Sequence, residues 1–509
     1  MTHRPRALRW IVPAVALSLS PIGCKQQSEL PPRAEVLVVA DTDLPVPSVV
    51  GRLRVDVYTD DTWLESADIL REDPSDWPVS FSVYSDDELT DKLVWVRLRA
   101  WALDRSRDYR GERFRDWGAD EPEVDPLARP RLMREGQDVT PPTEPQPLVT
   151  VDRLLRVRLT PGVRGSVRVT LHGACAGTMA KFGASTEAFL PAAGSAETCV
   201  DQEQKRVPVV ESPIDPSMDL PTTTAQGTWG AEPCTLPDPA RICVPGGVTV
   251  LGSSSFVFDV GLETVPERIA RIRSFQLDRY EVTVERYRTA LASGFAPTSL
   301  PPLANEGDLV SVDDYRDTGY CTWSKSPRGR EDYGLSCIPW STARQFCQFL
   351  GGDLPTEAQW EYVAAAAGRA RRTDFAWGDA LPTCDRAVYG RITPRPSEYG
   401  LCNALGLGPR PVRDAEPGDV TPIGAVGLGG SLSEWTLDSC VPYSSECWFK
   451  APITNPACLA KGDLPRCVRG GAWTAGETYL RSARRFLDVP NARETMVGMR
   501  CAWPVEAQP

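Results

Sequence analysis

The sequence predicts two folded domains of different class, an all-β sandwich followed by a loop-rich α+β domain. Runs of residues with period-two alternation predict strands between residues 35 and 171. After residue 275, three segments have the spacing of amphipathic helices, and the rest is rich in Gly, Pro and Cys. The 509 residues are 41% apolar and 24% charged, which is sufficient for ordinary globular cores.

The first domain is predicted over residues 35–200. Its expected strands are 35–40, 52–59, 79–84, 92–100, 154–159 and 166–171. In the run from Arg52 to Tyr58 every second residue is apolar, which places one face on a core and the other in water. This pattern favours an immunoglobulin-like sandwich. Residues 104–146, first Arg/Asp-rich and then Pro-rich, are expected to form an exposed insert.

Residues 201–243 are rich in Pro, Thr and charge and predict a linker, so the second domain is expected over 244–505. A strand is expected at 275–282, followed by helices near 283–292, 341–350 and 356–367. Thr283 and Thr356 are expected to cap the first and third helices. The second helix should bury one face that contains Ala343, Phe346, Cys347 and Leu350.

The N-terminal residues predict export. Three arginines precede an apolar run that is too short to span a bilayer, and Cys24 follows. Residues 1–24 are typical of a bacterial lipoprotein signal peptide, with lipid attached to Cys24 and 25–34 as a tether. An ordinary secretory signal with an incidental cysteine is the alternative. Lys25, where inner-membrane retention has Asp, favours a lipid anchor in the outer membrane of the cell envelope.

Charge excludes one class of partner. The net charge of −12 and the isoelectric point near 5.0 would repel a phosphate backbone, and no basic block offsets them. We therefore expect no nucleic-acid partner.

Cysteine content agrees with export, because an even number remains once Cys24 is set aside from the fifteen. Proximity in the sequence favours disulfides that join Cys175 with Cys199, Cys234 with Cys243, Cys321 with Cys337, and Cys384 with Cys402. Two further bridges are expected among Cys440, Cys447, Cys458 and Cys467. Cys347 and Cys501 remain, and the connectivity is left open.

Six short blocks follow one another in the second domain. They are Asp353-Leu354-Pro355-Thr356-Glu357-Ala358-Gln359-Trp360-Glu361-Tyr362, Trp377-Gly378-Asp379, Ser433-Glu434-Trp435-Thr436, Arg469-Gly470-Gly471-Ala472-Trp473, Arg481-Ser482-Ala483-Arg484 and Gly498-Met499-Arg500-Cys501. In order and spacing they resemble the formylglycine-generating (sulfatase-modifying factor) family. The resemblance implies a loop-rich α+β fold related to C-type lectins.

The resemblance also points to missing chemistry. Active members are understood to bind Cu(I) through two thiolates and to oxidise a substrate cysteine with dioxygen, and here the two cysteine positions are Ala475 and Leu480. Neither side chain can bind a soft metal ion, so a copper cofactor is not expected. Thiolates from the cysteines at 440–467 could substitute, but disulfides are the favoured interpretation there.

Calcium is the remaining metal candidate. The resemblance implies a calcium segment at Gly430-Ser431-Leu432-Ser433-Glu434-Trp435, with Glu434 and the carbonyls of Gly430 and Leu432 as ligands. A second loop would use Asn403 and Asp414. The alternative is that Glu434 pairs with an arginine such as Arg469.

Histidine limits other mechanisms, because the chain contains only His3 and His172. The second domain can therefore build neither a histidine iron centre nor a histidine-dependent triad. Four tryptophans, at 360, 377, 435 and 473, could form a ligand platform, but a core role is the favoured interpretation.

These observations favour a cell-envelope lipoprotein whose second domain is catalytically degenerate and binds a ligand, either an exported protein or a glycan. One alternative is an oxidase or maturation factor that acts on exported proteins. The other is a structural or adhesion component of the envelope.

Overall fold

The structure is a computed structural model of the chain. It describes residues 33–505 with gaps at 88, 104–105, 109–132, 135–136, 139–142, 185–189, 202, 204, 222–223, 236–239, 254–263, 310–317 and 393–400. The predicted signal, most of the tether and Cys24 lie outside these residues. Within them, no helix combines the length and the apolar character needed to cross a membrane.

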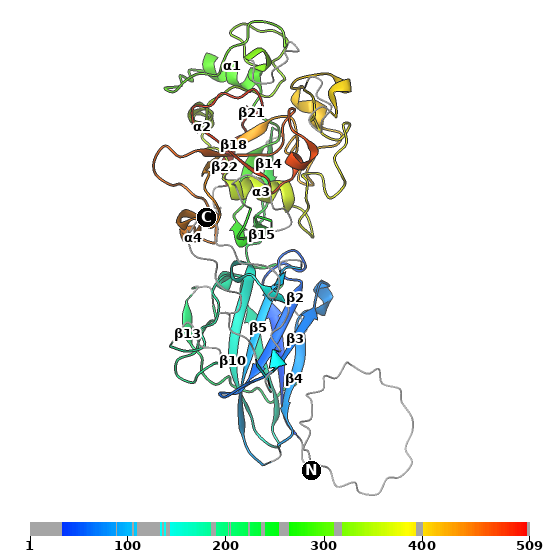
Figure 1. The fold of residues 1–509 in the computed structure, drawn as a ribbon, viewed down its shortest axis with the longest axis vertical. Helices are drawn as coiled ribbons and strands as arrows, with labels where there is room; N and C mark the ends of the chain where they lie inside the picture. The colour runs from blue at the N-terminus through cyan, green and yellow to red at the C-terminus, as the bar shows by residue number, and fades with distance from the viewer. Residues whose placement is uncertain are drawn as a thin grey trace, which may run out of the picture. The chain divides into compact units, whose positions relative to one another are not determined.

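The chain divides into two compact units (Figure 1). One unit comprises Met1–Leu103, Arg129–Pro142 and Thr150–Thr228, and the other comprises Asp104–Ala128, Thr143–Val149 and Trp229–Pro509. Both units are rich in strands, and the four α-helices among the described residues belong to the second.

The first unit contains two main sheets. One has the order β11-β1-β4 and the other β10-β5-β2-β3, and only the β1–β11 pair is parallel. The strands are β1 (Ala34–Thr42), β2 (Arg52–Tyr58), β3 (Trp63–Leu70), β4 (Val79–Ser85), β5 (Lys92–Trp101), β10 (Thr150–Leu159) and β11 (Arg164–Leu171). Six of them fall in the six predicted runs. β3 was not predicted, because it is an edge strand whose residues are largely half-exposed and show no clear alternation.

The polar face of β2 is a correction to the sequence analysis. Arg54 and Asp56 were expected in water, but each is only 1% exposed. Asp56 accepts a hydrogen bond from Arg99 at 2.8 Å, and Arg54 donates to Asp68 on β3 at 2.8 Å. Because β2 lies between β3 and β5, charged side chains of those strands cover Arg54 and Asp56 and shield them from water. Burial raises the pKa of Asp56, but Arg99 and a hydrogen bond from Ser66 outweigh this effect and lower it.

The predicted linker also differs from expectation. β13 (Arg206–Pro208) pairs with β12 (Glu197–Cys199), and the amide of Ser212 donates to the carbonyl of Arg156 on β10 at 2.8 Å. Asp215 and Ser166 exchange two backbone hydrogen bonds. The Pro-rich composition suggested a free tether, whereas these backbone groups pair with strands of the first unit.

Only parts of the predicted 104–146 insert are described. They contain β6 (Ser106–Asp108), which pairs with β9 (Thr143–Pro145), and β7 (Met133–Arg134), which pairs with β8 (Gln137–Asp138). The rest of the insert lies outside the described residues.

The second unit has short strands in three sheets besides the β6–β9 pair. Their orders are β14-β17-β22, β15-β16 and β20-β19-β18-β21. The strands are β14 (Arg241–Val244), β15 (Gly247–Leu251), β16 (Arg268–Ile272), β17 (Phe275–Asp278), β18 (Ser433–Ser439), β19 (Arg466–Arg469), β20 (Arg485–Asp488), β21 (Val497–Gly498) and β22 (Ala502–Pro504). The four-stranded sheet carries the candidate site described below.

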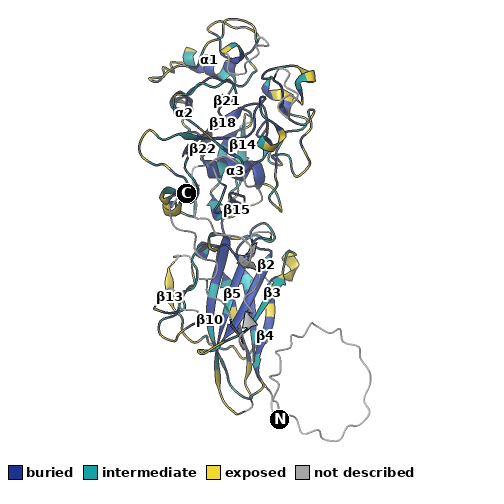
Figure 2. Ribbon diagram, in the orientation of Figure 1, coloured by how far each residue is buried: buried dark blue, intermediate teal, exposed yellow. Residues whose placement is uncertain are grey.

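Three of the four helices were predicted. They are α1 (Val284–Ala292), α2 (Trp340–Phe349) and α3 (Glu357–Ala365), and the short α4 (Glu446–Lys450) was not expected. The Thr283 hydroxyl caps α1, and Thr356 forms a reciprocal capping box with Gln359 on α3. Nearly all of α3 is buried, including Glu357 and Glu361 (Figure 2).

Those two buried carboxylates bind arginines. Arg485 donates to Glu357 through Nε at 2.9 Å and Nη2 at 2.8 Å, and Arg469 bonds to both Glu357 and Glu361. Three of the four tryptophans considered above, Trp360, Trp435 and Trp473, are at most 1% exposed, which confirms their core role. Trp377 is half-buried and stacks on Phe375.

Seven disulfides hold the chain, one in the first unit and six in the second. They join Cys175 with Cys199, Cys234 with Cys243, Cys321 with Cys337, Cys347 with Cys501, Cys384 with Cys402, Cys440 with Cys467 and Cys447 with Cys458. Proximity in the sequence had favoured four of these bridges: Cys175–Cys199, Cys234–Cys243, Cys321–Cys337 and Cys384–Cys402. The structure also settles the two bridges that the sequence left open among the four cysteines at 440–467.

Candidate functional site

The second unit contains a cavity of about 730 Å³, and strands of its four-stranded sheet contribute to the wall. Ser433 begins β18, Val468 lies on β19, Phe486 to Asp488 lie on β20, and Val497 begins β21. The other lining residues are Ile392, Gly471, Ala472, Thr474, Ala475, Tyr479, Glu494 and Met496. A volume of this size is in the range of small-ligand pockets.

The wall combines apolar side chains with polar groups, and two of its hydroxyl groups have identified partners. The Ser433 hydroxyl donates to the carbonyl of Gly470 at 3.0 Å, and the Thr474 hydroxyl lies 3.2 Å from Sδ of Met496. The rings of Tyr479 and Phe486 stack with centroids 5.6 Å apart. The cavity therefore offers aromatic and aliphatic surface beside polar groups.

Two carboxylates add negative charge to this wall. Asp488 is half-buried, and desolvation, reinforced by the charge of Glu494, raises its pKa to about 6. One oxygen of Asp488 accepts the amide of Val489 at 2.8 Å. Within the described part of the chain, neither Asp488 nor Glu494 forms an ion pair.

Ala475 lines the cavity directly, and Leu480 lies behind it. Leu480 ends the 3₁₀-helix η9 (Glu477–Leu480) and is 1% exposed. It belongs to an apolar cluster with Phe375 and Tyr389, and Ala475 packs against the same cluster. The two positions that resemble the family's cysteines are thus close to the cavity, but their hydrocarbon groups cannot bind Cu(I).

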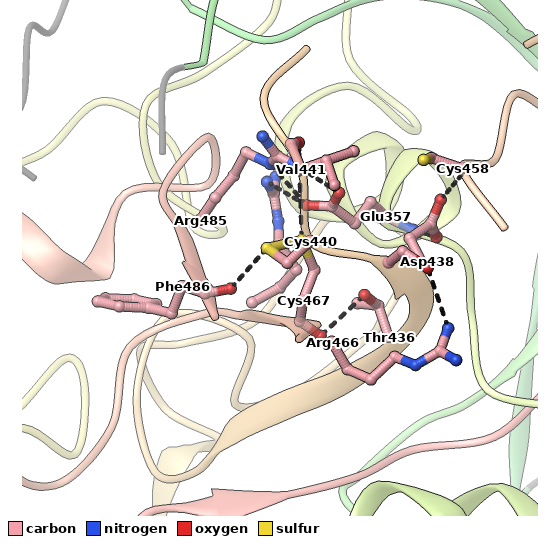
Figure 3. Close-up of a disulfide and its surroundings, with 12 residues drawn as sticks. Glu357, Thr436, Asp438, Cys440, Val441, Cys458, Arg466, Cys467, Arg485 and Phe486 are labelled. Atoms are coloured by element: carbon pink, nitrogen blue, oxygen red, sulfur yellow. Dashed lines mark hydrogen bonds and ion pairs between the residues drawn. A yellow bond between two sulfur atoms is a disulfide. The ribbon is translucent and has the colours of Figure 1, made fainter. Parts of the chain in front are cut away.

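No other cysteine among the described residues supplies a thiolate pair. Cys440 and Cys467, one candidate source, form a disulfide near β18 and β19 (Figure 3). Arg485 extends toward this bridge, with Nη2 3.4 Å from Sγ of Cys467. Cys447 and Cys458 form a second bridge. The residues present therefore do not fit the copper site that the family resemblance implies.

The calcium prediction meets a similar obstacle at Glu434, which is fully buried. Arg500 donates to both of its oxygens at 2.6 to 2.8 Å, and Trp360 Nε1 donates at 2.8 Å. A cation at this carboxylate would have to displace a guanidinium group. The alternative, that Glu434 pairs with an arginine, is confirmed, but the arginine is Arg500. Arg469, the arginine named in the prediction, binds Glu357 and Glu361 instead.

The other predicted calcium ligands do not complete a site. Asp414 is exposed and pairs with Arg410 at 2.9 Å, and the carbonyl of Asn403 accepts the amide of Gly406. No group of three or more His, Cys, Asp or Glu side chains placed to hold a metal occurs in the described ranges. The residues at the two implied calcium positions therefore do not fit the ion.

Two buried acids that the sequence analysis missed hold the loop before Glu434. Glu281 accepts the amide of Leu432 at 2.8 Å, and Asp419 accepts the amide of Gly430 at 2.8 Å. Burial is the largest cause that raises the pKa of Glu281 to about 8 and that of Asp419 to about 7. Neither acid lies in a recognisable motif. Asp419 and its partner are 11 positions apart in the sequence, and Glu281 and its partner are 151 positions apart, so no local pattern indicates these contacts.

His172, in the first unit, forms contacts that are typical of a structural role. Its Nδ1 lies 2.9 Å from the Asp43 carboxylate, which also accepts the amide of Gly173. No other histidine is described.

Comparison with known proteins identifies the second unit. Residues 227–505, more than half of the chain, match the family described as "Sulfatase-modifying factor enzyme 1-like domain". The chain belongs to this sulfatase-modifying factor family. The match begins before the predicted boundary at residue 244 and includes the Cys234–Cys243 bridge.

Two curated relatives of this family member are enzymes by name. Hercynine oxygenase of Mycolicibacterium thermoresistibile is 30% identical over 185 residues, which are 35% of this chain and 37% of the relative. Formylglycine-generating enzyme of Streptomyces coelicolor is 28% identical over 177 residues, which are 34% of this chain and 54% of the relative. The chain thus spans from about a third to about half of the length of these relatives.

Among solved structures, PvdO from Pseudomonas aeruginosa is 19% identical. The alignment covers 52% of this chain and 93% of PvdO, with a TM-score of 0.39.

Proposed function

We propose that this protein is a binding member of the sulfatase-modifying factor family that has lost the copper oxidase chemistry implied for the active members. The observation that carries the proposal is the pair Ala475 and Leu480 at the family's cysteine positions. The disulfides support it, because they occupy all fourteen described cysteines. The cavity beside Ala475 is the proposed binding site, with an exported protein or a glycan as the source of the ligand.

The proposal is tested by a metal and thiol inventory of the purified full chain. We expect no reactive thiol after unfolding without reductant, no uptake of Cu(I) in competition with a chromophoric chelator, and no oxidation of a cysteine-containing peptide. Stoichiometric Cu(I) bound by two protein thiols, or turnover of that peptide, would contradict it. The A475C/L480C double variant serves as the positive control for copper uptake.

The proposal includes a place in the cell. Residues 1–24 act as a lipoprotein signal, acyl chains on Cys24 anchor the protein in the outer membrane, and the first unit serves as an immunoglobulin-like spacer. Mass spectrometry of the N-terminal peptide should find Cys24 acylated. An unmodified Cys24, or an N-terminus produced by cleavage elsewhere, would contradict the anchor.

A further inference from the structure

We propose that the cavity beside Ala475 binds a ligand with an aliphatic or aromatic stem that ends in an organic cation, as lysine and arginine side chains do. This inference rests on the proposed function, which makes the cavity a binding site, and adds the chemical class of the ligand.

The cationic end is inferred from Asp488 and Glu494. Both line the same cavity, and the charge of Glu494 adds to burial in raising the pKa of Asp488, as expected for carboxylates that repel each other. Neither has an ion-pair partner among the described residues. A bound cation would relieve the repulsion and would be attracted more strongly in a partly desolvated site than in water.

The neighbouring arginines have other partners. Arg466 faces Asp488 across the β19–β20 pair, but its guanidinium lies 4.0 Å from the ring centroid of Trp340 and donates to Ser439 Oγ at 3.3 Å. Arg485, on the same strand as Asp488, is bound to Glu357. Among the arginines that the structure describes, these two therefore leave the charge of Asp488 and Glu494 unneutralised.

Two further described arginines, Arg493 and Arg484, also have other partners. Arg493 donates to the carbonyl of Pro301, and Arg484 stacks over the rings of Tyr479 and Phe486 at 4.8 and 5.1 Å. The same two rings line the cavity, and their contact with Arg484 shows that their faces accept a guanidinium.

The stem is inferred from the rest of the wall. Ile392, Val468, Ala475 and Met496 supply aliphatic surface, and Tyr479 and Phe486 supply aromatic surface. A bare divalent cation is a poor match, because calcium needs six to eight oxygen ligands and two carboxylates do not provide them. An anion would be repelled. A neutral sugar would leave the two carboxylates without a counter-charge.

The test measures binding of hexylamine, and of a short peptide with one central lysine, to the full chain by calorimetry. The matched neutral probes are 1-hexanol and the same peptide with norleucine in place of lysine. We expect the cationic probe of each pair to bind on the order of tenfold more tightly than its neutral partner, because a charge-assisted hydrogen bond distinguishes them. A higher affinity for the lysine peptide than for hexylamine would assign a protein source to the ligand, and equal affinities would assign a free amine.

Two variants, D488N and E494Q, remove the carboxylates without changing side-chain size. Each should weaken binding of the cationic probes on the order of tenfold and leave the neutral probes unchanged within about twofold. D463N removes one exposed charge outside the cavity and should change nothing. Thermal unfolding of each variant shows whether it is folded.

Equal binding of charged and neutral probes, or unchanged affinity in a folded D488N/E494Q double variant, would overturn the inference. Either result would leave the proposed function standing, since that depends on the thiol and copper measurements. Copper uptake with peptide oxidation would instead overturn the proposed function itself.

Discussion

At the scale of single residues, some residues in and near the cavity were noted in the sequence, and others were identified only in the structure. The resemblance to the family assigned Ala475 and Leu480 to the cysteine positions of active members, and Ala475 lines the cavity. Asp488 and Glu494 could not be predicted, because they lie in no motif and only folding brings them to the same wall. The buried pairing of Glu434 with Arg500 was hidden for the same reason, since its partners are 66 residues apart.

Asp438 provides a test of buried charge near the Cys440–Cys467 bridge (Figure 3). Its oxygens accept the amides of Glu357 at 2.7 Å and Cys458 at 2.6 Å, and burial, with the charge of Glu357, raises its pKa to about 7 from 3.8. The folded state therefore binds this proton more tightly than the unfolded state. Protonated Asp438 therefore stabilises the folded state fully below about pH 4, and this stabilisation is lost as the pH rises toward about 7.

The D438N variant cannot titrate at this position. We expect the free energy of unfolding of the wild type, measured relative to D438N by urea denaturation, to fall by at most about 1.4 kcal/mol per pH unit between pH 4 and 7. D463N, which removes an exposed carboxylate, should give a curve parallel to the wild type. Parallel curves for the wild type and D438N would show that Asp438 is ionised normally in the fold.

At the scale of elements, local signals predicted the helices better than the strands of the second unit. Thr283 and Thr356 cap their helices as expected because capping depends on residues only three positions apart. The strands β18, β19 and β21 are mostly buried on both faces, and β20 has only four residues, so no alternation marks them. Their pairing depends on contacts between segments that are distant in sequence.

The α3 cap can be tested directly. Thr356→Ala removes the hydroxyl that accepts the amide of Gln359 at 3.1 Å and should lower the free energy of unfolding by about 1 kcal/mol. Thr356→Ser keeps the hydroxyl and should lie close to the wild type. Chemical denaturation measures both. A loss for Ser as large as that for Ala would mean that packing of the threonine methyl group, and not the capping hydrogen bond, stabilises this helix start.

At the scale of the whole molecule, composition misjudged how much of the chain is folded. The segment at 201–243 has the Pro and Thr content of a tether, yet its backbone pairs with β10 and β11 and it contains a disulfide. Cysteine proximity identified the local bridges but not the pairing of Cys347 with Cys501, which are 154 residues apart. That bridge joins α2 to the residue before β22, and so connects the middle of the second unit to its end.

The span of this bridge predicts its contribution to stability. In the chain-entropy description a disulfide restricts the unfolded chain more when it closes a longer loop, which gives about 5 kcal/mol for a span of 154 residues and about 2.6 kcal/mol for the span of 9 between Cys234 and Cys243. We therefore expect C347A/C501A to lower the free energy of unfolding by about 2 kcal/mol more than C234A/C243A. Both double variants keep the thiol count even, so they form a matched pair.

Urea denaturation without reductant measures this difference, and thiol titration of each variant verifies that the other six bridges are formed. The comparison is sensitive to mechanism because the two bridges differ about 17-fold in span. Equal losses, or a larger loss for the short bridge, would contradict the loop-length argument. They would indicate that contacts around each bridge in the folded unit, rather than freedom of the unfolded chain, determine how much these cross-links stabilise the protein.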